Sequence, residues 1–187
     1  MSKLALQAAL QAFEAIHLRE AVYVACPVSS GRRELDLMVE LSVFDRDRLR
    51  DEHQARWRRD VLEPNKTAAA EAVSAARRRH ADRGVINPAG FELKGFTQPE
   101  YDSLCAGIIR SHVGRLVLAD GWQFSRGARL EAVLALELGL TVEDCAGRPL
   151  EPHRVRELID VTPALVARGF PQDVANELLP DVALSPV

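Results

Sequence analysis

The residues best suited to chemistry lie between Asp120 and Glu131, in the stretch DGWQFSRGARLE. Glu131 is the residue that we expect to react, because the helix dipole and free backbone N–H groups hold a carboxylate ionised early in a helix. An ionised carboxylate at a ligand site can attack the anomeric carbon of a sugar. The alternative is that Glu131 only stabilises the start of the helix.

The same stretch carries groups that bind anions. Ser125 supplies a hydroxyl, Gly127 lets the backbone approach a ligand closely, and the N-terminus of the following helix favours negative charge. Arg126 and Arg129 flank these groups and can add charge-assisted contacts to a phosphate, or lie in water. We therefore predict an anion site here, with a simple turn into the helix as the alternative.

Two strands joined through a helix must position this loop. Residues 115–119 and 140–142 are expected as strands and residues 129–138 as the helix between them, with Glu131 in its first turn. Such βαβ units are right-handed and parallel. Ligands of these sheets bind beyond the carboxyl ends of the strands, where the loop at 120–128 lies.

A second loop is expected at the same edge of the sheet. Residues 21–26 are almost entirely apolar, as a central parallel strand should be. Pro27 ends this strand, and Ser29, Ser30 and Gly31 follow it. These three residues line the sugar or phosphate of a ligand, or they form an ordinary loop.

The remaining elements complete an α/β pattern. Further helices are expected over 4–16, 34–44, 45–60, 65–80, 98–112, 152–168 and 171–179, with a strand over 85–88. The order predicts a Rossmann-like, doubly wound parallel sheet of about four to five strands with flanking helices. We treat residues 1–187 as a single domain, with an N-terminal helix in 1–20 and C-terminal helices in 150–187.

Two local features of the 45–80 region carry specific expectations. Residues 45–60 alternate acid and base, which is typical of a solvated helix with many ion pairs. The alternative is an arginine-rich surface for nucleic acid, although its acidic residues dilute the charge. Asn65 or Thr67 is expected to cap the helix that follows.

Composition argues against several classes of protein. The 187 residues are 47% hydrophobic with a net charge of −3, so we expect one domain with a full core and no nucleic-acid partner. Cys26, Cys105 and Cys145 lack metal-ligand or disulfide spacing, so we expect no metal and no cofactor. Without a signal peptide or an apolar run of membrane-spanning length, a cytoplasmic location and no membrane partner are expected.

Three stretches resemble a known family: VYVACPVSSGRRE, VINPA and ADGWQFSRGARLEAVLALELGL. Over residues 21 to about 145 they are similar to the nucleoside 2-deoxyribosyltransferase-like superfamily, closest to a phage and bacterial branch of uncharacterised domains. That superfamily includes deoxyribosyltransferases and nucleotide hydrolases that cut the N-glycosidic bond. Two departures are Cys26, where many members carry glycine, and a longer chain between the first two strands.

The resemblance implies a role for each matching residue. Glu131 corresponds to the nucleophile, and Tyr23 to a tyrosine that lies beside it and orients it. Ser125 and Gly127 correspond to residues that hold a 5′-phosphate. Asp120 is the nearest match to an acid that assists the leaving base. From the residues alone, Tyr23 can instead be a core tyrosine and Asp120 a turn residue.

The sequence therefore predicts an N-glycosidase or deoxyribosyltransferase that acts on a nucleoside or nucleoside 5′-monophosphate. Hydrolysis of a monophosphate is preferred because the loop is rich in anion-binding groups. The alternatives are a non-catalytic nucleotide sensor and an NAD-cleaving effector. Trp122 either stacks on the base or covers the edge of the core. A homodimer or higher homo-oligomer is expected, because the apolar face of residues 4–16 exceeds what a lead-in to a strand requires.

Overall fold

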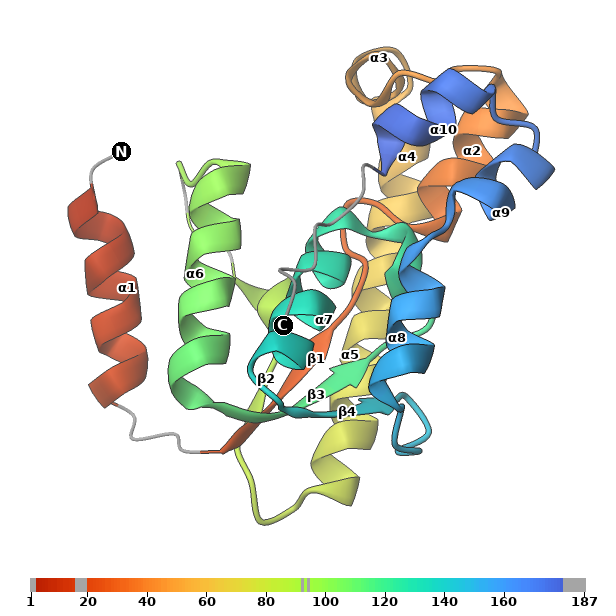
Figure 1. The fold of residues 1–187 in the computed structure, drawn as a ribbon. Helices are drawn as coiled ribbons and strands as arrows, with labels where there is room; N and C mark the ends of the chain where they lie inside the picture. Colours follow the sequence, from red (N-terminus) through yellow and green to blue (C-terminus); the bar gives the residue numbers. More distant parts are fainter. Residues whose placement is uncertain (1–2, 16–19, 92, 94, 180–187) are drawn as a thin grey trace.

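The computed structural model describes residues 3–15, 20–91, 93 and 95–179 (Figure 1). Within them lies a four-stranded sheet, with all strands parallel in the order β2-β1-β3-β4. The strands are β1 (Ala21–Ala25), β2 (Val85–Ile86), β3 (Val113–Leu118) and β4 (Thr141–Asp144). The predicted Rossmann-like α/β class is confirmed. Parts of the predicted terminal segments, at 16–19 and 180–187, lie outside the described residues.

Alternate residues of the central strands face two different helical layers. Tyr23 and Leu116 belong to the apolar cluster on one face, whereas Val22 and Val117 pack with the helix on the other. The first face is covered by α6 (Gln98–His112), α7 (Arg126–Glu137) and α8 (Pro152–Ile159), and the second by α5 (Glu63–Arg79). Because both faces are covered, β1 is apolar throughout, as predicted.

The N-terminal helix α1 (Lys3–Ala15) packs along α6 (Figure 1). Gly107 permits the contact, because a Cβ there would lie 2.7 Å from Leu10 Cδ2. The Phe13 ring meets the edge of Phe91 at a centroid distance of 5.6 Å. Part of the apolar face of α1, which suggested a partner subunit, therefore packs against α6 of the same chain. Formation of a homo-oligomer stays a prediction.

A second group of helices, here called the helical lobe, has its own apolar core (Figure 1). It consists of α2 (Arg32–Leu41), α3 (Arg46–Glu52), α9 (Thr162–Ala167) and α10 (Gln172–Leu178). Phe124, from the 3-10 turn η3 (Trp122–Phe124) after β3, also belongs to this core. The lobe therefore joins segments that follow β1 to segments near the end of the described chain.

Residues 45–60 carry the predicted ion pairs, including Arg48 with Glu52 and Arg56 with Asp60, but they do not form the single helix predicted. Helix α3 ends at Glu52, α4 (Gln54–Trp57) restarts after His53, and a π-helical segment η1 (Arg58–Leu62) continues into α5. Leu49 within this region and Val61 just after it are both 0% exposed and belong to the core of the helical lobe. The alternating charged residues of this segment gave no helical apolar periodicity, so the buried positions could not be predicted.

The predicted caps of α5 are also wrong. Because α5 continues directly from η1, its first residue is Glu63 and neither Asn65 nor Thr67 lies at an N-cap. Asn65 is buried instead and holds the loop after β1: its Nδ2 donates to the carbonyls of Val28 at 3.0 Å and Ser30 at 2.8 Å. Thr67 bonds back to the helix itself.

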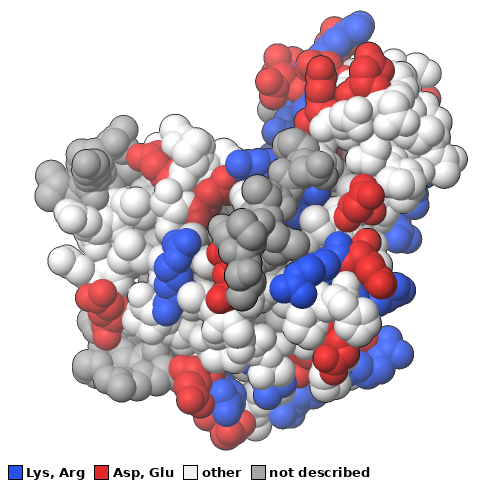
Figure 2. All heavy atoms as spheres, viewed as in Figure 1, with Lys and Arg blue, Asp and Glu red and all other residues white. Residues whose placement is uncertain are grey.

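Charges of both signs are interspersed over the face shown in Figure 2. No helix in the described part of the chain is long and apolar enough to cross a membrane.

Candidate functional site

A cavity of about 840 Å³ opens where the helical lobe meets α6 and α7. In Figure 2 the surface is indented between these two parts, and blue and red atoms lie together there. Its size falls in the range of small-molecule sites. Polar residues of its lining include Ser29, Ser30, Arg46, Arg50, Asp102, Cys105, Ser125, Arg126 and Glu131.

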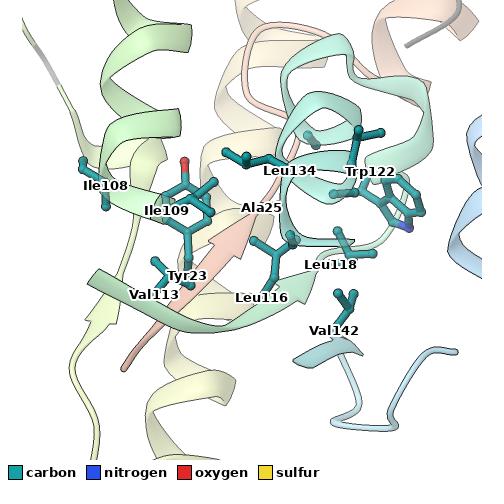
Figure 3. Packing of buried hydrophobic residues seen from close by; sticks show 14 of the residues in the cluster. Tyr23, Ala25, Ile108, Ile109, Val113, Leu116, Leu118, Trp122, Leu134 and Val142 are labelled. Atoms are coloured by element: carbon teal, nitrogen blue, oxygen red, sulfur yellow. The ribbon is translucent and has the colours of Figure 1, made fainter. Parts of the chain in front are cut away.

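Glu131 lines this cavity and is hydrogen-bonded to Tyr23. The Tyr23 hydroxyl donates to Glu131 Oε1 at 2.6 Å, although the two residues are 108 positions apart. Tyr23 comes from the centre of β1 and is 0% exposed. Figure 3 shows its ring beside Ile109 and Leu116, with the oxygen directed away from the strands. The fold thus brings together the two residues that the resemblance paired.

Burial raises the pKa of Glu131 to about 8. The charge of Asp102 raises this pKa further, while hydrogen bonds from Tyr23 and Cys105 oppose the rise. The prediction that the helix dipole keeps Glu131 ionised is therefore wrong. Helix α7 begins at Arg126, so Glu131 lies in its second turn, where the dipole has little effect.

The neighbouring groups of Glu131 are held in their neutral forms. Burial, and then the Glu131 charge, raise the pKa of Tyr23 well above its usual value, so the phenol remains a donor. Burial likewise raises the pKa of Cys26 and of Cys105 to about 12. Both cysteines line the cavity as thiols rather than reactive thiolates.

The predicted anion loop contributes Ser125, Arg126 and Gly127 to the cavity. Ser125 occupies the N-cap of α7, yet its side chain makes no capping bond; it accepts a hydrogen bond from Ser30 Oγ at 3.2 Å. A Cβ added at Gly127 would meet nothing within 4 Å, so the backbone there is open to a ligand. Arg126 is bonded to Asp102 at 2.8 Å.

Five predicted site residues do not line the cavity: Tyr23, Gly31, Asp120, Trp122 and Arg129. Asp120 is exposed and accepts from the Cys145 thiol at 3.0 Å, so it is placed as a turn residue. Trp122 is 5% exposed within the core, on the opposite side of the cluster from Tyr23 in Figure 3, so it covers the core rather than a base. Arg129 is 1% exposed and is buried rather than solvated.

Gly31 acts on the loop rather than on a ligand. Its φ of 99° lies in the region that favours glycine, and a Cβ there would lie 2.7 Å from Pro27 Cβ. Ser29 and Ser30, between these two residues, do line the cavity. The tight turn therefore presents the two serines that the sequence analysis selected.

Sequence reasoning missed several lining residues, most notably Arg46 and Arg50. Both bind Glu34, which is 0% exposed: Arg46 Nε lies 3.0 Å from Glu34 Oε2, and Arg50 Nη2 lies 2.9 Å from Oε1. Their spacing of four residues on one helix was the available signal. Asp102 and Cys105 were also missed. Both lie on the side of α6 that faces the cavity, as Ala106 does.

No three His, Cys, Asp or Glu side chains gather to hold a metal ion in the described part of the chain. The protein has an α/β fold with a cavity at the edge of its parallel sheet. Glu131 lies in the wall of this cavity and Tyr23 lies behind it. A family model described as "Domain of unknown function (DUF4406)" matches residues 62–144. The match includes Ser125 and Glu131 but not Tyr23. No curated protein and no solved structure matches the chain.

Proposed function

We propose that the protein cleaves or transfers at the N-glycosidic bond of a nucleoside or nucleoside 5′-monophosphate, with Glu131 as the nucleophile. The observation that carries this proposal is the 2.6 Å hydrogen bond from Tyr23 to Glu131 at the wall of the cavity. A buried phenol fixes the orientation of the carboxyl group, and an oriented carboxylate is what attack on an anomeric carbon requires.

The reaction proceeds in two displacements. A Glu131 oxygen bonds to the anomeric carbon while the bond from that carbon to the base nitrogen breaks, and the base leaves with the electron pair and takes up a proton. Water then attacks the glycosyl ester, gives its hydroxyl to the sugar and its proton to solvent, and restores the carboxylate. In a transferase a second base replaces the water.

The raised pKa of Glu131 sets the conditions for the first displacement. Only the ionised form attacks, and at neutral pH it is a minority of the unliganded protein. Asp120, the predicted acid for the leaving base, lies outside the cavity lining, whereas Asp102 lies within it. Asp102 is therefore the better placed carboxyl group to interact with the departing base.

A nucleotide-binding sensor without turnover is the second candidate. The neutral Glu131 favours it, because a protonated carboxyl group can donate a hydrogen bond to a ligand but cannot act as a nucleophile. The two candidates share the same cavity and differ only in turnover. An activity measurement above pH 8 separates them, since Glu131 is then largely ionised.

The test is release of free base at pH 7 and pH 9 from a panel of nucleosides, nucleoside 5′-monophosphates and NAD. We expect release from at least one nucleoside or monophosphate, and a loss of at least roughly a thousandfold in Glu131→Gln. Glu71→Gln is the matched control, because Glu71 is exposed on α5 away from the cavity. Release from NAD alone would favour the NAD-cleaving alternative, and no release at either pH would favour the sensor.

A further inference from the structure

Arg46 and Arg50 form a guanidinium pair on the helical-lobe side of the cavity. They come from successive turns of α3, and one carboxylate, Glu34, binds both. Because Glu34 is 0% exposed, it holds the two side chains from behind. Two positive charges against one carboxylate leave the cluster with an excess positive charge at the cavity wall.

Parts of both guanidinium groups remain unused by the protein. Arg46 Nη2 and Arg50 Nε are buried without a hydrogen-bond partner in the part of the chain that the structure describes. Buried donors are normally paired, so each exception calls for an explanation. A bound anion in the cavity neutralises the excess charge of the cluster.

The pair is continuous with the predicted anion loop. Arg50 Nη2 donates to the Ser29 carbonyl at 3.1 Å, and the Ser30 hydroxyl donates to Ser125 Oγ at 3.2 Å. Asn65 holds the Ser30 carbonyl, which fixes the loop between the two walls. Hydrogen bonds therefore link the guanidinium pair, the serine loop and the N-terminus of α7 along the cavity wall.

We propose that Arg46 and Arg50, held by Glu34, bind the phosphate of a nucleotide substrate, so that the site takes a nucleoside 5′-phosphate in preference to a free nucleoside. The nucleoside part rests on the proposed function. A guanidinium group matches phosphate geometry, and two arginines fixed in advance lose little freedom on binding. This assignment replaces Arg126 and Arg129, of which the first is paired with Asp102 and the second lies outside the cavity lining.

The test is calorimetric titration of the Glu131→Gln protein, which binds without turnover. The ligands are ribo- and deoxyribonucleosides of the common bases, their 5′-monophosphates and inorganic phosphate. We expect at least one monophosphate to bind roughly tenfold or more tightly than its nucleoside. Adding Arg50→Gln should remove about ten- to a hundredfold of monophosphate affinity and leave nucleoside affinity unchanged.

Two further variants keep the result interpretable. Arg50→Lys keeps a positive charge opposite Glu34 but loses the planar fork, so it should fold and show an intermediate loss. Arg48→Gln, on the same helix but bonded to Glu52 at the surface, should bind as the parent protein does. Thermal unfolding of each variant establishes that the fold is intact.

Three outcomes overturn the proposal: equal affinity for every nucleoside and its monophosphate, no binding of any phosphorylated ligand, or an unchanged phosphate preference in a folded Arg50→Gln protein. None of them depends on catalysis. A phosphate preference without release of base from the protein that retains Glu131 would leave this inference standing and remove the proposed function instead.

Discussion

Glu131 lies in the wall of the cavity, and Glu34 lies behind that wall. The two carboxyl groups differ in the charge of the groups that bind them. Glu34 is bound by two guanidinium groups. Glu131 is bound by a phenol and a thiol, and no ion pair joins it to a cation within the described residues. Glu143 resembles Glu34, since it is 2% exposed and lies between His80 and Arg115.

The difference sets Glu131, the proposed nucleophile, apart from the paired carboxylates Glu34 and Glu143. A buried carboxylate that has only neutral hydrogen-bond donors carries the cost of burial in its pKa, as Glu131 does. Perturbed pKa values of this kind cluster at functional sites. Three measurements test the contrast between Glu34 and Glu131. They are the pH dependence of base release, the free energy of unfolding after Glu34 is replaced, and the pH dependence of stability after Glu131 is replaced.

The largest expected effect is on the pH dependence of base release. Under the proposed mechanism kcat/KM follows the ionised fraction of Glu131, so it should rise roughly several hundredfold between pH 5 and pH 8 and then level off. The Tyr23 bond lowers this pKa, so Tyr23→Phe should move the inflection to higher pH. Tyr101→Phe should not, because the Tyr101 hydroxyl instead accepts from the Leu93 N–H and donates to the Phe91 carbonyl. A flat profile from pH 5 to pH 8 would contradict the assignment.

The next effect concerns the charge of Glu34. Glu34→Gln leaves two guanidinium groups without their buried carboxylate, so we expect the free energy of unfolding to fall by about 3 kcal/mol. Urea denaturation at pH 7 measures this change. Glu52→Gln, which removes an exposed partner of Arg48, should leave the midpoint nearly unchanged. Equal midpoints for the two variants would show that Glu34 is not a structural charge.

The smallest effect is a stability gain on removing Glu131. The carboxyl group has a pKa of about 8 when folded against 4.5 as its ordinary value, so the native state holds its proton more tightly than the unfolded state. The contribution of Glu131 to the free energy of unfolding of the wild type is therefore greatest below pH 4.5. It decreases as the pH rises from 4.5 to 8. Each pKa unit corresponds to about 1.4 kcal/mol, and partial contact with cavity water reduces the full shift.

Glu131→Gln removes this titration, so the variant should match the wild type at pH 5 and exceed it by roughly 2 kcal/mol at pH 9. Urea denaturation of both proteins at the two pH values gives the difference directly, because the other titrating groups are common to both. A variant less stable than the wild type at pH 9 would place a stabilising charge at Glu131 and make it resemble Glu34.

The sheet could be predicted from sequence because its signals are local. Strand β1 is an unbroken apolar run, and α6 begins where Thr97 and Glu100 form a capping box with Pro99 in the first turn. The start of α7 was predicted three residues late, since Arg126 and Gly127 give no apolar periodicity. That error moved Glu131 into the wrong turn, and the burial that raises its pKa depends on how α7 packs on the sheet and α6, which no local pattern reports.

The cavity could be predicted only in part. The pairing of Tyr23 with Glu131 came from a family resemblance, since nothing local relates residues 108 positions apart. The guanidinium pair was missed because the partner of Arg46 and Arg50 lies on another helix, α2. In a segment of alternating charges, only the crossing of helices decides which arginines turn inward.

The strand order also constrains how the chain acquires its site during synthesis. Strand β1 is central, but its register partners follow much later: Val85 opposite Val22, and Leu116 opposite Tyr23. A ribosome adds about 5–20 residues per second, so Tyr23 waits roughly 5–20 s before Glu131 is made. The most apolar strand is unpaired for much of that time, because neither β2 nor β3 has yet been made. Any chain interrupted before α7 holds the phenol without its carboxyl partner.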